Sequence, residues 1–239
     1  MEYIYGLQPI RSLSDAVRLN QKLYVRPVQC WVDEQLWSKE RHTLAGLKNV
    51  TAVTDAKDVP QPYRQAYLHQ KILMTIELLP VEDGDWQDSH VFLALDGVTD
   101  PQNLGAILRT AKAMGVGAVV MPKHRQASIT PLVRRIAQGA AERMPIIVVN
   151  NLSQWLSGRQ QDGYWCYGAS AYAEQSLSAQ DFDVKSIIIV GSEGKGMRQK
   201  LITQCDFMVS ISTDKTFPSL NVVQASAMLL YAYRTQHPL

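Results

Sequence analysis

The residues most suited to binding a ligand lie near the end of the chain, where an apolar run leads into closely spaced glycines. Residues 186–190, Ser-Ile-Ile-Ile-Val, are followed by Gly191, Gly194 and Gly196. This pattern predicts a buried strand whose carboxyl end opens into a loop that a ligand can approach closely. In open α/β sheets, ligands bind in crevices at the carboxyl ends of the strands.

The spacing of these glycines does not match two common nucleotide-binding loops. It is G-x-x-G-x-G, whereas the dinucleotide fingerprint is G-x-G-x-x-G and the phosphate-binding loop continues from Gly-Lys to Ser or Thr. Lys195 is followed by Gly196, so the hydroxyl that would hold magnesium is missing. Taken alone, the loop is explained equally well as a tight turn at the end of a strand.

A second loop places two polar side chains at the start of a helix. Residues 207–212 predict another strand, Pro218 favours extended backbone, and Ser219 is a candidate helix cap. Apolar residues then follow at helical spacing: Leu220, Val223, Ala227 and Leu230. A capped amphipathic helix explains this stripe, but it does not explain Asn221 beside Ser219, where both side chains would face the same crevice as the glycine loop.

An arginine in the middle of the chain is a candidate for holding an anion. Residues 91–96 predict a buried strand, and Pro101 and Asn103 have the chemistry of a turn and a helix cap. The inward stripe of the helix follows: Leu104, Ile107, Leu108 and Ala111. Arg109 lies off this stripe. It is an ordinary surface residue unless a crevice lies beside it, in which case its planar guanidinium suits phosphate oxygens.

The elements that position these residues alternate between strand and helix. Further apolar runs predict strands at residues 116–121, 145–149 and 164–169, and Thr130 followed by Pro131 marks the start of a helix. The pattern predicts an α/β fold with a mainly parallel sheet and helices on both faces.

The amino-terminal third of the chain has its own pattern of short apolar runs and helix-like stretches. We therefore expect a small α/β domain over residues 1–79, a linker over 80–89 that is rich in acidic residues, and a second domain over 90–239. His69 and Gln70 are a conspicuous polar pair in the first domain. A single histidine beside a strand is usually structural, so we do not count it as a site residue.

The composition sets limits on the class of protein. The chain has 239 residues, 46% of them hydrophobic, and a net charge of +2, so no overall basic field indicates nucleic acid and any RNA contact must use a local patch. Its three cysteines lie far apart, without the C-x-x-C spacing of a metal site, which favours a reducing cytosol. No segment reaches membrane-spanning length, so we expect a cytoplasmic protein.

Three stretches of the chain resemble the signature motifs of the SpoU (TrmH-like) family of RNA ribose 2′-O-methyltransferases, within the SPOUT superfamily. They are Leu95-Asp-Gly-Val-Thr-Asp-Pro-Gln-Asn-Leu-Gly-Ala-Ile-Leu-Arg-Thr-Ala111, Val190-Gly-Ser-Glu-Gly-Lys-Gly-Met197 and Ser219-Leu-Asn-Val222. All three occur in the family's order, which is more specific than any one of them. The resemblance covers residues 90–235 and extends more loosely to the amino-terminal domain.

The resemblance implies a SPOUT fold, in which the parallel sheet with helices on both faces is threaded into a trefoil knot. It further implies a preceding ribosomal-protein-like α/β domain that binds the RNA, S-adenosyl-L-methionine bound in the knotted loops, a homodimer, and no metal. Knots are rare, so this expectation rests on the resemblance alone.

The resemblance also implies the site residues. Those with catalytic roles are Asn103, Arg109, Glu193, Ser219 and Asn221. Those near the cofactor are Ala169, Gly191, Met197, Ile211, Ser219 and Leu220. In this family, the arginine that corresponds to Arg109 is the proposed activator of the 2′-hydroxyl, and it is sometimes described as a general base. A charged guanidinium has no acceptor, so we expect Arg109 to hold the adjacent phosphate and stabilise the developing alkoxide instead.

The layout of two domains resembles the enzymes that methylate a guanosine ribose of large-subunit rRNA. Candidate phosphate contacts, each of which could equally be a solvated charge, are Lys123, Arg125, Arg134, Arg135 and Arg143. The alternatives are a tRNA ribose 2′-O-methyltransferase and an RNA-binding relative without catalysis. A nucleotide-dependent oxidoreductase is remote because its fingerprint is missing.

Overall fold

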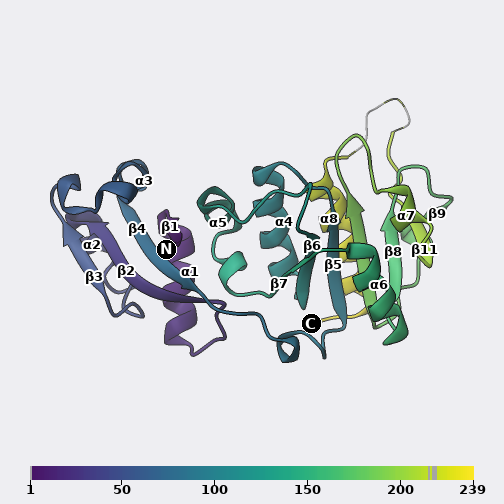
Figure 1. Cartoon of the computed structure of the whole chain (residues 1–239), viewed down its shortest axis with the longest axis horizontal. Helices are drawn as coiled ribbons and strands as arrows, with labels where there is room; N and C mark the ends of the chain where they lie inside the picture. Colours follow the sequence, from purple (N-terminus) through teal and green to yellow (C-terminus); the bar gives the residue numbers. More distant parts are fainter. Residues whose placement is uncertain (1, 215, 217–219) are drawn as a thin grey trace. The chain divides into compact units, whose positions relative to one another are not determined.

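The structure is a computed structural model that describes residues 2–214, 216 and 220–239. The chain forms two compact units, shown in Figure 1. The first contains the residues up to Val81 together with Ile129–Met144, and the second contains Glu82–Ser128 and Pro145–Leu239. The boundary after Val81 lies inside the predicted linker, whereas the inclusion of Ile129–Met144 in the first unit differs from the predicted division.

The first unit is built on a four-stranded sheet in the order β1-β4-β2-β3. The strands are β1 (Glu2–Tyr5), β2 (Val25–Asp33), β3 (Val50–Val53) and β4 (Ile72–Leu78). The helices are α1 (Leu7–Arg18), α2 (Glu34–Glu40), α3 (Arg64–Gln70) and α5 (Pro131–Ala137). Strand β4 is antiparallel to β1 and β2, whereas β2 and β3 are parallel. The main core of this unit includes Ile4, Leu13 and Met74.

One ion pair and one backbone hydrogen bond join the segment Ile129–Met144 to the rest of the first unit. The guanidinium of Arg134 donates to Glu2 at 2.6 Å and to Glu142 at 2.8 Å, and both Arg134 and Glu142 are buried. The backbone N–H of Tyr24 also donates to the Glu142 carbonyl at 2.8 Å. Charges are rarely buried without a partner. The partners supplied by residues before Val81 therefore explain why this segment does not belong to the second unit.

The second unit contains a seven-stranded sheet in the order β7-β6-β5-β10-β8-β11-β9, and every neighbouring pair is parallel. The strands are β5 (Val91–Asp96), β6 (Ala118–Pro122), β7 (Ile146–Val149), β8 (Trp165–Ala169), β9 (Gln175–Ser176), β10 (Ser186–Gly191) and β11 (Phe207–Ser210). The helices are α4 (Pro101–Ala113), α6 (Leu152–Gln161), α7 (Gln199–Ile202) and α8 (Val222–Gln236). Figure 1 shows α6 and α8 on opposite faces of this sheet. The predicted parallel α/β fold is therefore confirmed.

The two central strands carry the core of the second unit. Every residue of β5 is buried, and so is every residue of β10 except its last, Gly191. The predicted inward stripe of α4 is correct, since its buried residues include Leu104, Ile107, Leu108 and Ala111. These layers place the carboxyl ends of β5 and β10 next to each other, with Gly191 paired to Asp96.

The predicted stripe of α8 is wrong in phase. The helix begins at Val222, and its buried residues are Val222, Ser226, Leu229, Leu230 and Tyr233. Apolar residues lie on most sides of α8, so more than one stripe has helical spacing, and packing decides which of them is buried. Of the four apolar residues predicted to face inward, only Leu230 belongs to the buried face.

Candidate active site

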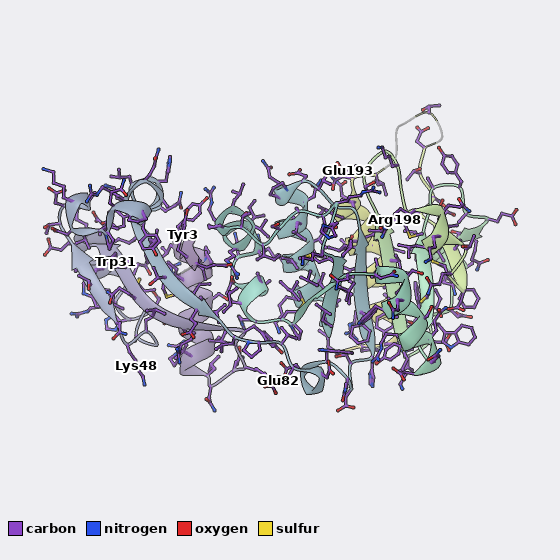
Figure 2. All side chains as sticks on the ribbon, in the orientation of Figure 1. Tyr3, Trp31, Lys48, Glu82, Glu193 and Arg198 are labelled. Atoms are coloured by element: carbon purple, nitrogen blue, oxygen red, sulfur yellow. The ribbon has the colours of Figure 1, made fainter. Side chains whose placement is uncertain are left out.

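Three polar side chains from distant parts of the sequence meet at the carboxyl edge of the second unit's sheet. Asn103 lies in the first turn of α4, which follows β5. Glu193 lies in the loop after β10, and Asn221 comes directly before α8, which follows β11. Because all these strands are parallel, the elements that follow them emerge at the same edge of the sheet. Figure 2 labels Glu193 near the end of β10.

These three side chains form one hydrogen-bonded network. The Asn103 amide donates from Nδ2 to Glu193 Oε1 at 2.9 Å. The Asn221 amide donates from Nδ2 to Asn103 Oδ1 at 3.2 Å and also to Glu193 Oε1. The network therefore joins residues of all three sequence motifs, and the carboxylate of Glu193 is exposed at its centre.

The helix caps leave these amides available for the network. The predicted cap Asn103 is wrong, because Asp100 caps α4 by accepting from the Gln102 N–H at 2.9 Å. The predicted cap Ser219 lies outside the described residues, and α8 is capped by Asn221, whose Oδ1 accepts from the Val223 N–H at 2.8 Å. Asn221 thus uses its oxygen for the helix and its nitrogen for the network, which fixes the orientation of the amide.

The glycine loop folds back on the end of β10. Backbone hydrogen bonds of 3.1 Å and 2.9 Å join Ser192 and Gly196 in both directions. A Cβ atom on Gly191 would lie 2.1 Å from the carbonyl carbon of Gly196, so the backbones approach too closely for any side chain. Gly194 and Gly196 have φ values of 79° and 66°, in the left-handed region. The loop therefore presents bare backbone at the edge of the sheet, as predicted from its glycines.

An ion pair between Asp96 and Arg198, which the sequence did not predict, fixes the end of the glycine loop. Asp96, the last residue of β5, is buried, and its Oδ1 accepts from Arg198 Nε at 2.7 Å. Its Oδ2 accepts from the backbone N–H of Arg198 at 2.8 Å. The sequence offered one sign of this site, because Asp96 is a carboxylate at the end of the otherwise apolar strand β5. Arg198 directly follows the glycine loop, and Figure 2 labels it together with Glu193.

Arg109 lies apart from the network on the exposed side of α4. It is six residues after Asn103, or about 9 Å along the helix axis, and about 240° around it. The guanidinium forms no hydrogen bond or ion pair with the residues that the structure describes. Arg109 is therefore available for an external anion, and its role in holding one stays a prediction.

Three of the six predicted cofactor residues lie at the ends of adjacent strands. Ala169 ends β8, Gly191 ends β10, and Ile211 follows β11. Met197 is buried, and its Cε would lie 2.6 Å from a Cβ on Gly168, so its side chain rests on the bare backbone of β8. Leu220 is half-buried. Backbone groups beside apolar walls suit a neutral adenosine and a sulfonium, so these residues fit the cofactor that the family uses.

The five basic residues predicted to contact RNA have different surroundings. Lys123 and Arg125 are exposed in the loop after β6. Arg134 is buried between Glu2 and Glu142, so its charge is already neutralised. Arg143 donates to Ser12 at 3.0 Å and to Gln21 at 2.5 Å, and the Arg135 guanidinium lies 5.5 Å from the ring centre of Tyr5. A structural role thus accounts for Arg134, and we do not carry it forward as an RNA contact.

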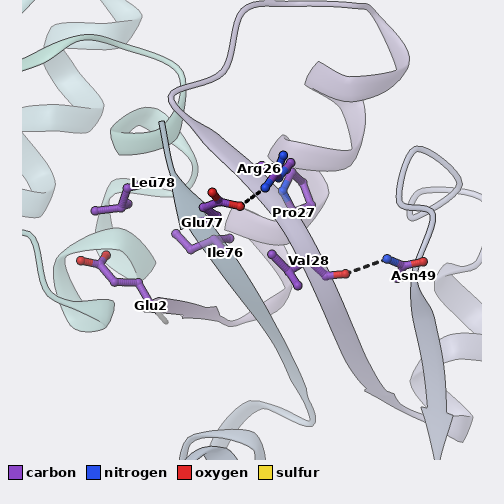
Figure 3. Close-up of a pocket in the computed structure, with 8 residues that line it drawn as sticks. All are labelled: Glu2, Arg26, Pro27, Val28, Asn49, Ile76, Glu77 and Leu78. Carbon is purple, nitrogen blue, oxygen red and sulfur yellow. Dashed lines mark hydrogen bonds and ion pairs between the residues drawn. The ribbon is translucent and has the colours of Figure 1, made fainter. Parts of the chain in front are cut away.

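A surface depression of about 700 Å³ in the first unit does not coincide with the candidate site. It lies along β2 and β4, where Arg26 and Glu77 form an ion pair and Asn49 donates to the Val28 carbonyl at 2.9 Å, as Figure 3 shows. None of the predicted catalytic or cofactor residues lines it. Within the described residues, no group of His, Cys, Asp and Glu side chains is placed to hold a metal ion, and no helix is long and apolar enough to span a membrane.

The fold is that of the SpoU and TrmH methyltransferases. A putative RNA methyltransferase of the TrmH family from Porphyromonas gingivalis is similar to the chain with a TM-score of 0.76 at 22% identity, covering 98% of this chain and 90% of that one. The SpoU methyltransferase AviRb from Streptomyces viridochromogenes, in complex with AdoMet, is similar with a TM-score of 0.72 at 21% identity, covering 98% and 89%. These similarities define the class of fold.

Sequence comparison identifies the family within this class. The family model described as the SpoU rRNA Methylase family matches residues 90–231. The 23S rRNA (guanosine-2′-O-)-methyltransferase RlmB of Pseudomonas putida is 46% identical over 97% of this chain and 95% of its own length. The RlmB of Coxiella burnetii is 34% identical over 98% and 95%. The chain belongs to the SpoU rRNA methylase family, as its motifs predicted.

Proposed function

We propose that this protein transfers a methyl group from S-adenosyl-L-methionine to the ribose 2′-hydroxyl of a guanosine in 23S rRNA. The proposal is supported by the two RlmB relatives, which are named for that activity and match almost the whole chain. The structural observation that carries it is the network of Asn103, Glu193 and Asn221, which unites the three motifs at one edge of the sheet.

The cofactor would lie against the ends of β8, β10 and β11. Gly191 and the backbone near Ile211 and Leu220 would bind its adenosine, and Met197 would supply an apolar wall. When bound, S-adenosylmethionine supplies a methyl group on a positively charged sulfur, which needs no further activation. The task of the chain is therefore to align the hydroxyl, favour its deprotonation and exclude water.

Arg109 would stabilise the negative charge of the substrate. Its guanidinium stays protonated and has only donors, so it suits the phosphate beside the target ribose and the oxygen that develops charge during transfer. Its exposed position on α4, without a partner among the described residues, leaves all its donors available to RNA. The proton of the hydroxyl must go to another acceptor, such as water or a carboxylate.

Glu193 would orient the reacting ribose. Its Oε1 accepts from two amides, which holds the carboxylate in one position without occupying Oε2. The carboxylate also lies beside the amino-terminal ends of α4 and α8, where the helix dipoles favour a negative charge. Asn103 and Asn221 thus position Glu193, while Ser219, which lies outside the described residues, is proposed to contribute from the same motif as Asn221.

The proposed assembly is a cytoplasmic homodimer with a trefoil knot in the second unit. Helix α8 supports a dimer because it exposes apolar side chains, with Met228 45% and Tyr231 63% exposed. The first unit would bind rRNA, and Lys123 and Arg125 would contact phosphates. Sedimentation of the purified chain at several concentrations tests the dimer.

Methyl incorporation into unmodified transcripts tests the function. The wild-type protein should label a 23S rRNA transcript and leave tRNA unlabelled. Arg109→Ala should reduce the rate by at least about 100-fold while calorimetric binding of S-adenosylmethionine stays unchanged, and Arg109→Lys should restore only part of the rate. Lys185→Ala, which removes an exposed cation just before β10, at the opposite edge of the sheet from the candidate site, is the matched control. Label in tRNA alone, or normal methylation by Arg109→Ala, would contradict the proposal.

A further inference from the structure

One face of the first unit's sheet carries a continuous strip of aromatic rings. Its members, which we call the aromatic strip, are Tyr3, Tyr5, Trp31 and Tyr63. The ring centres are 6.2 Å apart for Tyr3 and Tyr5, 5.5 Å for Tyr3 and Tyr63, and 6.1 Å for Trp31 and Tyr63. Figure 2 labels Tyr3 and Trp31, at two positions of the strip.

The register of the sheet brings these rings together. Tyr3 and Tyr5 are two residues apart on β1 and therefore point to the same face. Tyr5 is paired with Leu73 of β4, which is paired in turn with Trp31 of β2. Tyr63, from the segment before α3, packs against Tyr3 and Trp31 from above the sheet. Segments far apart in the sequence thus form one surface.

The strip lies at the edge of a small core, because its rings pack against the buried cluster of Val53, Val59, Tyr67 and Leu73 without being fully buried themselves. Leu73 beneath it is fully buried, whereas all four rings are only partly buried. The hydroxyls of Tyr3, Tyr5 and Tyr63 form no hydrogen bond within the described residues. Buried tyrosines of the second unit behave differently, since the Tyr233 hydroxyl donates to a carbonyl at 2.7 Å. Each tyrosine of the strip therefore keeps its hydroxyl available for another molecule.

A cation extends the strip at one end. Arg135 places its guanidinium over Tyr5, with its carbon 5.5 Å from the ring centre. Unlike Arg134, which is neutralised by two carboxylates, Arg135 has no ion pair within the described residues. A guanidinium on an aromatic face keeps its donors pointing outward, where they can bind a phosphate.

We propose that the aromatic strip binds an unpaired segment of the RNA substrate by stacking its bases. Rings of this kind bind bases through their faces, and a neighbouring arginine binds the backbone, which is the chemistry that single-stranded nucleic acid requires. The occupant is therefore RNA with unstacked bases, and double-stranded RNA would not fit because its bases are already stacked. This inference rests on the proposed function, because it concerns how that substrate is held.

Binding of fluorescent RNA to the full-length protein tests the inference without requiring catalysis. The variant Trp31→Leu combined with Tyr63→Leu keeps apolar cover over the sheet but removes two stacking faces. It should weaken binding of a single-stranded oligonucleotide by about 5- to 150-fold for each stacked base lost. Trp31→Phe, which retains a ring, should restore most of the affinity. Trp165→Leu is the matched control, since Trp165 is 43% exposed on β8 of the second unit.

A second readout separates folding from binding. Cross-linking of 5-iodouridine in the RNA should map to the aromatic strip of the wild-type protein, and it requires no variant. Unchanged affinity in the double variant, or cross-links only elsewhere, would overturn the inference even if methyl transfer is normal. A change in sedimentation without a change in RNA affinity would assign the strip to protein contacts and would also overturn it. Absence of methyl transfer by the wild type would instead contradict the proposed function.

Discussion

The substitution Asp96→Asn tests whether the buried carboxylate shapes the cofactor loop. Asp96 accepts two hydrogen bonds from Arg198, one from the backbone N–H at 2.8 Å and one from Nε at 2.7 Å, and its Oδ1 also lies 2.7 Å from Nη2 within the ion pair. Asparagine has almost the same shape but only one acceptor oxygen. If that oxygen faces the guanidinium, the new NH2 group faces the backbone N–H, and two donors then oppose each other.

The expected loss follows from burial. The Asp96 side chain is only 2% exposed, whereas that of Arg198 is 52% exposed. The guanidinium can therefore turn to water, but the groups around residue 96 cannot. Hydrogen bonds to charged groups contribute about 1.5–3 kcal/mol each, and losing one partner of a fully buried pair costs about 3–5 kcal/mol. We expect a loss of about 2–4 kcal/mol in the free energy of unfolding.

Two measurements distinguish a local effect from a general one. Thermal unfolding should show a melting temperature lower by about 4–16 °C in Asp96→Asn. Calorimetry should show that the affinity for S-adenosylmethionine falls by about tenfold or more. If binding must first order the loop at a cost of about 1.4 kcal/mol, the dissociation constant rises about tenfold. Asp181→Asn removes the same charge from an exposed position and should change neither quantity. Wild-type stability and affinity in Asp96→Asn would refute the assigned role.

Three further predictions follow from buried groups. Gly191→Ala should abolish cofactor binding and destabilise the protein, because the new Cβ would lie 2.1 Å from a backbone carbon. Gly158 has open space around it, so Gly158→Ala should be neutral or stabilising. Calorimetry and thermal unfolding of the two variants test this. Burial raises the pKa of the Glu142 carboxyl, so the folded protein holds this proton to higher pH than the unfolded chain. The contribution of Glu142 to stability should therefore fall as pH rises between those two pKa values, and urea unfolding of Glu142→Gln across a pH series should lack this slope. Burial raises the pKa of the Cys30 and Cys205 thiols to about 12, and that of Cys166 well above its ordinary value. A thiol-reactive reagent should thus label none of the three before unfolding, and rapid labelling of the native protein would contradict this.

Local pattern predicted the class of the second unit and the face of one helix. Alternating strands and helices indicate a parallel sheet because parallel strands need crossover connections. The stripe of α4 was correct because apolar spacing alone fixes which side of a helix is buried. The stripe of α8 failed because apolar residues lie on most sides of that helix, so spacing alone could not select the face that packs against α4 and β10.

The resemblance to a family identified candidate site residues that the spacing of apolar residues could not identify. Asn103, Glu193 and Asn221 are ordinary polar residues in the sequence, and only their match to three motifs identified them together. The hydrogen bonds show that these three side chains meet, whereas the catalytic roles of all five predicted residues and the trefoil knot stay predictions. The buried pair of Asp96 and Arg198 lies at the edges of the same motifs, but nothing in the residue types indicated that they bind each other.

The sequence by itself determined the α/β class, the glycine loop at the end of β10 and membership in a family of RNA methyltransferases. Only the tertiary structure decided that Ile129–Met144 belongs with the first unit and that Arg134 is buried there. It also placed Tyr63 between Tyr3 and Trp31. The physical reason is common to these cases: ion pairs and ring contacts depend on distance in space, and residues more than 25 positions apart reveal no such distance in a linear pattern.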